Sequence, residues 1–312
     1  MPQIKGLVVI MEFKNKNEEY TYNAMQSGKY SIASLDLLNC VDKIKLSDNT
    51  KSHIEYTNEL LFEYLRDIYA LKEETPGLKE FLVALKAADV IDNQSLEQEN
   101  SFLLGLYMQT IEETAQQKLE QYFKNNVKIN KELLKDLAKT LLTGTSTKPE
   151  GIIRESNEKF VGRMVNGEPI ISYFPIDYHD IDEGLTRVSE IYNERLAGET
   201  YDNLFMQPFL IHGLFGALQM FGDGNTRMGR LHQHMLLWQL INERTEYNFD
   251  SPPLFFSRAY YPFRGDYRAL IANLVKNGDS EAWNEWFLFN LKRLEDQIFQ
   301  NNEHVLELKR NL

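Results

Sequence analysis

Apolar residues recur at helical spacing along most of this chain, and this periodicity is the strongest constraint on its fold. In residues 54–71, for example, Leu61, Tyr64, Leu65 and Ile68 follow the three- and four-residue steps of one helix face. The same periodicity predicts helices over residues 96–123, 131–142, 182–196, 208–221 and 227–242, and an aromatic, helical C-terminal third. The sequence therefore predicts a mainly α protein.

A single stretch departs from this pattern. Asn166-Gly167 lies between two short apolar runs, at Val161–Val165 and at residues 170–174. An Asn-Gly pair between apolar runs is the strongest short-range signal for a β-hairpin, because both residues tolerate positive φ. We therefore expect one hairpin over residues 161–174.

Composition narrows the class of protein. The chain has 312 residues, of which 34 are basic and 46 acidic, so its net charge is −12. Such a surface repels phosphate backbones and anionic lipids, and we expect no nucleic-acid or membrane partner. No apolar run approaches the roughly 18 residues of a membrane span. The single cysteine, Cys40, cannot form an internal disulfide, so we expect a cytoplasmic protein.

A glycine-rich break, Gly222-Asp223-Gly224-Asn225, separates the last two predicted helices before the C-terminal third. Unpaired amides at the start of a helix attract anions, phosphate above all. Arg227 and Arg230 lie three residues apart, so both can face one pocket. Asp223 would be a natural ligand for Mg²⁺ beside a phosphate. The alternative is an ordinary turn between helices, with both arginines facing solvent.

This segment resembles the signature of the Fic/Fido-domain family, His-Pro-Phe-x-Asp/Glu-Gly-Asn-Gly/Lys-Arg-x-x-Arg. The residues in register are Phe221, Asp223, Gly224, Asn225, Arg227 and Arg230. Upstream, His212, Phe215 and Leu218 match the family's His-x-x-Phe-x-x-Ile helix, and residues 149–154 resemble its Pro-Gly-x-Arg stretch. Further matches are residues 253–257, Tyr267 and Trp283, so the resemblance spans residues 133–291.

The resemblance implies a Fic-type helical bundle with a short hairpin flap and an N-terminal helical extension. Residues 1–130 would form the N-terminal helical region, and residues 131–312 the Fic core and C-terminal helices. Members of this kind move AMP from ATP to a hydroxyl of a target protein. A target segment is held by adding a strand to the flap, here residues 161–174.

Roles for individual residues follow from the same resemblance. Asp223 would hold Mg²⁺, and Arg230 would meet the terminal phosphate of ATP. Gly224, Asn225 and Arg227 would cradle the phosphates. Gly222 and Thr226 would complete this nucleotide-binding loop.

Two positions depart from the signature. Gln219 stands where the family has its catalytic histidine, and Thr226 stands in place of Gly or Lys. An amide cannot accept a proton near pH 7, and losing a general base typically costs about 10²–10⁴-fold in rate. His212 lies about 10 Å from Gln219 along one helix, so we interpret it as a core histidine. His232 and His234 do not share a helix face and are interpreted as surface or packing residues, not as a metal pair.

Some family members carry an inhibitory helix with the pattern Ser/Thr-x-x-x-Glu-Gly/Asn, whose glutamate pairs with the second motif arginine. Residues 51–56 resemble it in part, through Ser52 and Glu55. The helix over residues 50–71 is therefore a candidate inhibitory helix, with Glu55 expected to approach Arg230. The alternative is a glutamate in the first turn of an exposed helix, which the helix dipole already favours.

Three functions remain open at the level of sequence. The chain could be a Fic-type transferase with reduced or altered catalysis, a nucleotide-binding regulatory module without turnover, or a scaffold with a vestigial pocket. Asp223, Asn225 and Arg230 are all present, which favours retained nucleotide binding. The target protein, the nucleotide base and the oligomeric state are not determined, and a homo-oligomer is compatible with the sequence.

Overall fold

The computed structural model describes residues 16–71, 77–78, 81–84, 117–118, 121, 128–142, 152–157, 159–166, 168–194, 196, 198, 200–250 and 252–310. Most of the predicted helix over residues 96–123 lies outside these ranges. The division of the chain at residue 130 stays a prediction.

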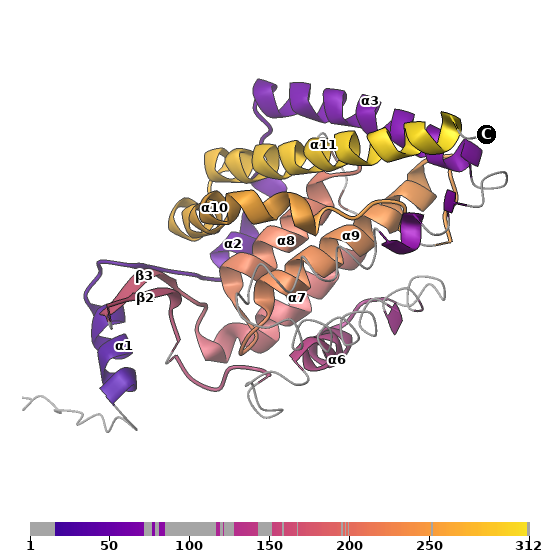
Figure 1. Ribbon diagram of the computed structural model, residues 1–312. Helices are drawn as coiled ribbons and strands as arrows, with labels where there is room; N and C mark the ends of the chain where they lie inside the picture. The colour runs from indigo at the N-terminus through magenta and orange to yellow at the C-terminus, as the bar shows by residue number, and fades with distance from the viewer. Residues whose placement is uncertain are drawn as a thin grey trace, which may run out of the picture.

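The described chain is mainly helical and contains one small sheet (Figure 1). In chain order, with η marking 3₁₀ helices, the elements are α1 (Lys16–Gln26), β1 (Ser31–Ile32), α2 (Asp36–Asn39), η1 (Val41–Lys43), α3 (Asp48–Leu71), α6 (Lys131–Leu142), β2 (Val161–Val165), β3 (Glu168–Phe174), η3 (Tyr178–Asp180), α7 (Ile181–Asn193), α8 (Met206–Leu218), α9 (Asn225–Arg244), η4 (Ser257–Phe263), α10 (Arg264–Asn277) and α11 (Ser280–Arg310). The helices predicted over residues 131–142, 182–196, 208–221 and 227–242 are confirmed, with ends that differ by a few residues.

Helix α8 forms the centre of the molecule. All 13 of its residues are buried, as expected for a helix that is apolar on every side. It contacts α7, α9, α10 and α11, which surround it in Figure 1. Helix α9 approaches it closely, since a Cβ atom at Gly229 would lie 2.6 Å from His212 Cδ2. This spacing allows no side chain at position 229 unless His212 moves.

The predicted hairpin is confirmed. Strands β2 and β3 pair antiparallel, and Asn166 at their turn has a φ of 52°. A third strand, β1, pairs parallel with the other edge of β3, placing Ser31 opposite Tyr173. The sheet order is therefore β1-β3-β2. A two-residue strand is too short to show an alternating pattern, so the sequence could not reveal β1.

Helix α3 packs along α11, joining an early part of the chain to its last helix (Figure 1). The contact includes buried hydrogen bonds: Thr50 Oγ1 donates to Asn284 Oδ1 (2.6 Å), and Thr57 Oγ1 donates to Glu295 Oε1 (2.6 Å). These polar residues explain why α3 begins at Asp48, ahead of the apolar periodicity that predicts it from residue 54. A threonine can be buried when its hydroxyl has a partner.

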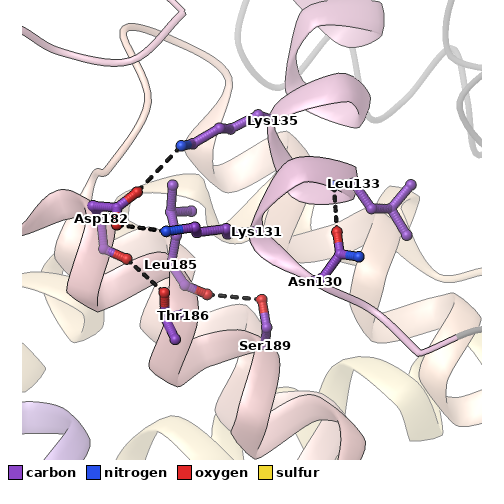
Figure 2. Close-up of polar contacts among 8 residues, drawn as sticks. All are labelled: Asn130, Lys131, Leu133, Lys135, Asp182, Leu185, Thr186 and Ser189. Atoms are coloured by element: carbon purple, nitrogen blue, oxygen red, sulfur yellow. Dashed lines mark hydrogen bonds and ion pairs between the residues drawn. The ribbon is translucent and has the colours of Figure 1, made fainter.

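Helix α6 is held against α7 by charged side chains (Figure 2). Lys131 Nζ lies 2.6 Å from Asp182 Oδ2, and Lys135 Nζ lies 3.3 Å from Asp182 Oδ1. The hydrogen bond with Asp182 raises the pKa of Lys131, and the same contact lowers the pKa of Asp182. At the start of α6, Leu133 N donates to Asn130 Oδ1 (2.9 Å), which caps the helix. Exposed ion pairs contribute little free energy, so these contacts orient α6 more than they stabilise it.

The buried His232 generates a prediction about acid stability. Its ring stacks on Phe215, and neither ring nitrogen has a hydrogen-bond partner among the described residues. Burial lowers the pKa of His232 from 6.5 to about 3. Below pH 6.5, His232 is therefore protonated in the unfolded chain but stays neutral in the folded chain. The free energy of unfolding falls as the pH drops from 6.5 to about 3.

We expect His232→Phe to weaken this acid sensitivity, because the ring stack remains and the titrating nitrogens are removed. Chemical denaturation at several pH values between 7 and 4 measures the effect. His304→Asn, at an exposed histidine 3.9 Å from its nearest carboxylate, serves as the control and should change the profile much less. An identical loss of stability with pH in the native and His232→Phe proteins would contradict the assignment.

Candidate functional site

The glycine-rich segment predicted as an anion site forms the loop between α8 and α9. Three separate parts of the chain meet there. Ile153 forms an isolated antiparallel bridge with Phe221, and Gly222 N donates to Ile152 O (2.8 Å). Ile176, which follows β3, donates its N–H to Leu218 O (3.3 Å). The loop is therefore fixed by backbone hydrogen bonds on both sides.

Gln219, at the catalytic-histidine position of the signature, ends α8 in the left-handed conformation (φ 51°, ψ 50°). That conformation costs a non-glycine residue on the order of 1–2 kcal/mol, and such strain often occurs at functional sites. Both polar ends of the side chain are engaged. Nε2 donates to Gly216 O (2.7 Å), and Oε1 accepts from Asn225 Nδ2 (3.0 Å). Gln219 thus joins the end of one helix to the start of the next.

Asn225 is the first residue of α9 and is almost fully buried. Its Nδ2 also donates to Phe221 O (3.0 Å), while its Oδ1 accepts from Phe221 N (2.8 Å). The side chain predicted to cradle phosphate therefore organises the loop from within. Gly222 has a similar structural role, because its carbonyl accepts from Lys159 Nζ while its N–H bonds Ile152.

Gly224 caps the start of α9 with a left-handed backbone (φ 70°). Its N–H donates to Asp223 Oδ1 (2.7 Å), and its carbonyl accepts from Met228 N (2.8 Å). As a glycine it brings no side chain to the N-cap of α9, and its backbone is buried. Asp223 keeps 43% of its side chain exposed, and Thr226 beside it is half-buried.

The two signature arginines are buried, each only 1% exposed. Arg227 Nη2 lies 3.4 Å from Asp223 Oδ2, and Arg230 Nη1 donates to Tyr267 Oη (3.4 Å). Most side chains in the first two turns of α9 are likewise buried. Neither arginine faces solvent, in contrast to that part of the alternative interpretation, and the phosphate-binding role stays a prediction. The two guanidinium groups also have different neighbours, one in the loop and one on α10.

Further residues complete the site. Arg154 donates through Nε to Gln219 O (2.9 Å) and through Nη2 to Ile176 O, and burial lowers its pKa to about 10. Lys159 bonds Gly222 O, and its pKa is lowered by burial, although nearby Asp223 opposes this shift. Tyr173 Oη donates to Gly216 O (2.6 Å). Sequence patterns did not indicate that Lys159 or Tyr173 belongs to the site. Both are distant from the loop in sequence, and the fold of the hairpin brings them next to it.

The structure does not bring the predicted inhibitory residues to the site. Glu55 and Ser52 are exposed on α3, whereas Arg230 is buried on α9. The face of α3 that packs carries Ile54 and Thr57, and a helix turns about 100° from residue 54 to residue 55. Glu55 here matches the alternative, a glutamate on the exposed side of a helix.

The histidines fit the packing interpretation. His212, His232 and His234 are all buried, which corrects the surface option for the last two. In the described part of the chain, no group of three or more His, Cys, Asp or Glu side chains could hold a metal ion. A metal at Asp223 would therefore need further ligands from a bound phosphate or from water. The described helices also include none with the length and apolar character that a bilayer crossing requires.

The bonds of Asn225 generate a prediction about the loop. Asn225→Ala leaves the buried N–H of Phe221 without its acceptor and releases Gln219, so we expect a loss of about 2 kcal/mol in stability. Differential scanning calorimetry should then record a melting temperature lower by roughly 5 °C. Asn58→Ala, at a half-buried position on α3, is the control and should change it little. Equal effects of the two substitutions would refute the role given to Asn225.

The geometry can be compared with known proteins. No family model matches the sequence, and no curated protein matches it. Among solved structures, the fold is similar to that of a Fic family protein from Desulfovibrio desulfuricans G20, with a TM-score of 0.60. The match covers 83% of this chain and 76% of that chain, at 15% sequence identity. The predicted architecture is thus confirmed, and the chain has the fold of a Fic family protein.

Proposed function

We propose that this chain is a Fic-domain protein that binds ATP with Mg²⁺ at the α8–α9 loop and has a reduced capacity to transfer AMP to a protein hydroxyl. One observation carries the proposal. The signature residues Asp223 to Arg230 span the start of α9, a buried helix whose N-cap is Gly224. The chain that carries them has the fold of a Fic family protein. The proposal rests on that placement together with the sequence resemblance.

The phosphate groups would lie against the start of α9. The amides of a helix's first turn carry partial positive charge, and Gly224 leaves their approach without a side chain. Arg227 and Arg230 add two positive charges within the next turn, both shielded from bulk water. Shielding strengthens an electrostatic attraction, because the local dielectric constant is lower than in water.

Asp223 is the residue that would hold Mg²⁺. Its side chain is half-exposed, so a cation can reach it, and a carboxylate is a preferred ligand of this ion. In the absence of a metal, the Asp223 carboxylate interacts with Arg227, whose Nη2 lies 3.4 Å from Oδ2. When bound, the metal supplies charge neutralisation on the phosphates. The residues present therefore fit the group that the resemblance implies.

Gln219 is the reason to propose reduced catalysis. Transfer of AMP requires that the attacking hydroxyl lose its proton, and an amide cannot take it near pH 7. The Gln219 side chain is also engaged at both polar ends, by Gly216 O and Asn225 Nδ2. These hydrogen bonds favour a second candidate function, a regulatory module that binds nucleotide without turning it over.

The target protein would add a strand to the hairpin. In the described part of the chain β1 occupies one edge of β3, while β2 pairs with β3 alone. The outer edge of β2 is therefore the proposed docking edge. Lys159, just before β2, bonds the Gly222 carbonyl, so a strand added along β2 would run towards the nucleotide loop.

The metal assignment generates a prediction about binding. We expect Asp223→Asn to weaken ATP binding about tenfold when Mg²⁺ is present, because the amide replaces a charged metal ligand. Binding without Mg²⁺ should change much less. Isothermal titration calorimetry measures both, with Asp250→Asn at an exposed loop position as the control. Absence of heat from the native chain at millimolar ATP would argue for a scaffold instead.

The base assignment generates a prediction about activity. We expect Gln219→His to create self-labelling with AMP from labelled ATP, at least about 100-fold above the native chain. Histidine tolerates the left-handed backbone at this position better than most residues. Because Glu55 lies away from Arg230, adding Glu55→Ala should not increase the labelling. The double variant Gln219→His, Arg230→Ala should show no self-labelling with AMP. Labelling of this double variant would indicate that the reaction occurs at another site.

A further inference from the structure

A buried polar network lies directly behind Arg230, on the side away from the loop. It contains six side chains from five elements: His212 on α8, Arg230 and Gln233 on α9, Tyr260 on η4, Tyr267 on α10 and Asn290 on α11. All six are less than 5% exposed. Burying so many polar groups is costly unless each is hydrogen-bonded, so the network needs a defined arrangement.

The shorter hydrogen bonds set one direction, since the opposing contact, from Tyr260 Oη to Gln233 Oε1, is longer at 3.3 Å. Tyr260 Oη donates to Asn290 Oδ1 (2.5 Å) and accepts from Gln233 Nε2 (2.9 Å). This orients the Gln233 amide, so its Oε1 faces His212 Nδ1 as an acceptor. Nδ1 of His212 must then carry the proton.

The state of His212 determines what Tyr267 can do. Burial and the charge of Arg230 lower the pKa of His212, so the ring is neutral and its Nε2 is an acceptor. Tyr267 Oη lies 2.7 Å from that nitrogen and donates to it. The hydroxyl oxygen then turns its lone pairs away from His212, and Arg230 Nη1 donates to it at 3.4 Å. The guanidinium also lies 5.9 Å from the centre of the Tyr267 ring.

We infer that Tyr267, oriented by His212, is a positioning residue that holds the Arg230 guanidinium for the terminal phosphate of a bound nucleotide. The role at the phosphate rests on the proposed function, whereas the coupling between the three side chains does not. Arginine has several rotatable bonds, and a neutral hydroxyl acceptor directs it without neutralising the charge that an anion needs. The family signature contains Arg230, but nothing in it indicates how the arginine is oriented.

The first experiment tests the coupling without any nucleotide. Tyr267→Phe removes the hydroxyl and keeps the ring beside Arg230. Tyr201→Phe is the matched control, since it removes a buried hydroxyl that donates to Val41 O, outside this network. In ¹⁵N NMR spectra, Tyr267→Phe should shift the Arg230 side-chain signal and the His212 Nε2 signal, and Tyr201→Phe should leave both signals in place.

The same spectra test the tautomer. We expect native His212 to show a protonated Nδ1 and an unprotonated Nε2. A proton on Nε2, or an Arg230 signal that responds equally to both substitutions, would overturn the inference. Thermal melting provides a check on folding, because both variants lose a buried hydroxyl and should be destabilised by a similar amount.

The second experiment tests the consequence for binding. Calorimetric titration with ATP and with AMP should show Tyr267→Phe binding ATP about fivefold to tenfold more weakly, with AMP affinity unchanged, because only ATP reaches Arg230. Tyr201→Phe should bind both as the native chain does. Equal losses for ATP and AMP would contradict the positioning role. If the native chain binds neither nucleotide while the NMR coupling is present, the proposed function fails and the coupling stands.

Discussion

The burial of helix α9 is the constraint on which the rest of the structure depends. Its first turns bring Asn225, Arg227 and Arg230 into the bundle, followed by His232, Gln233 and His234. Burying so many polar side chains is costly unless the surrounding elements supply hydrogen-bond partners or stacking surfaces. Tyr260 on η4 accepts from Gln233, and Tyr267 on α10 accepts from Arg230, whereas His232 stacks on Phe215 instead. The elements that follow α9 are therefore part of its support as well as part of the core.

The same constraint connects the hairpin to the candidate nucleotide site. The α8–α9 loop is tied by Arg154 and Lys159 to the chain that leads into β2, and by Tyr173 on β3 to the end of α8. The segments that flank the hairpin therefore contact Gln219 and Gly222 directly. The strain at Gln219 is maintained because both ends of its side chain are fixed.

Particular residues show how far sequence patterns reach. Apolar periodicity identified α8 and the body of α3, and Asn166-Gly167 identified the hairpin turn. Those signals are local, since they depend on spacing within one element. The first six residues of α3, strand β1 and the buried faces of α9 were not visible in this way. Each depends on a hydrogen-bond partner that is distant in the chain, such as Asn284 for Thr50.

The sequence by itself determined the helical class, the hairpin and the placement of a signature-like segment between two helices, because spacing and turn chemistry act over a few residues. The tertiary structure decided what those residues face. Arg227 and Arg230 are buried, and Glu55 is exposed to solvent. A hydrogen bond between Asn225 and Gln219 joins the two ends of the loop. Orientation of this kind depends on which distant side chains can satisfy a buried charge or amide, and only the folded chain brings those partners together.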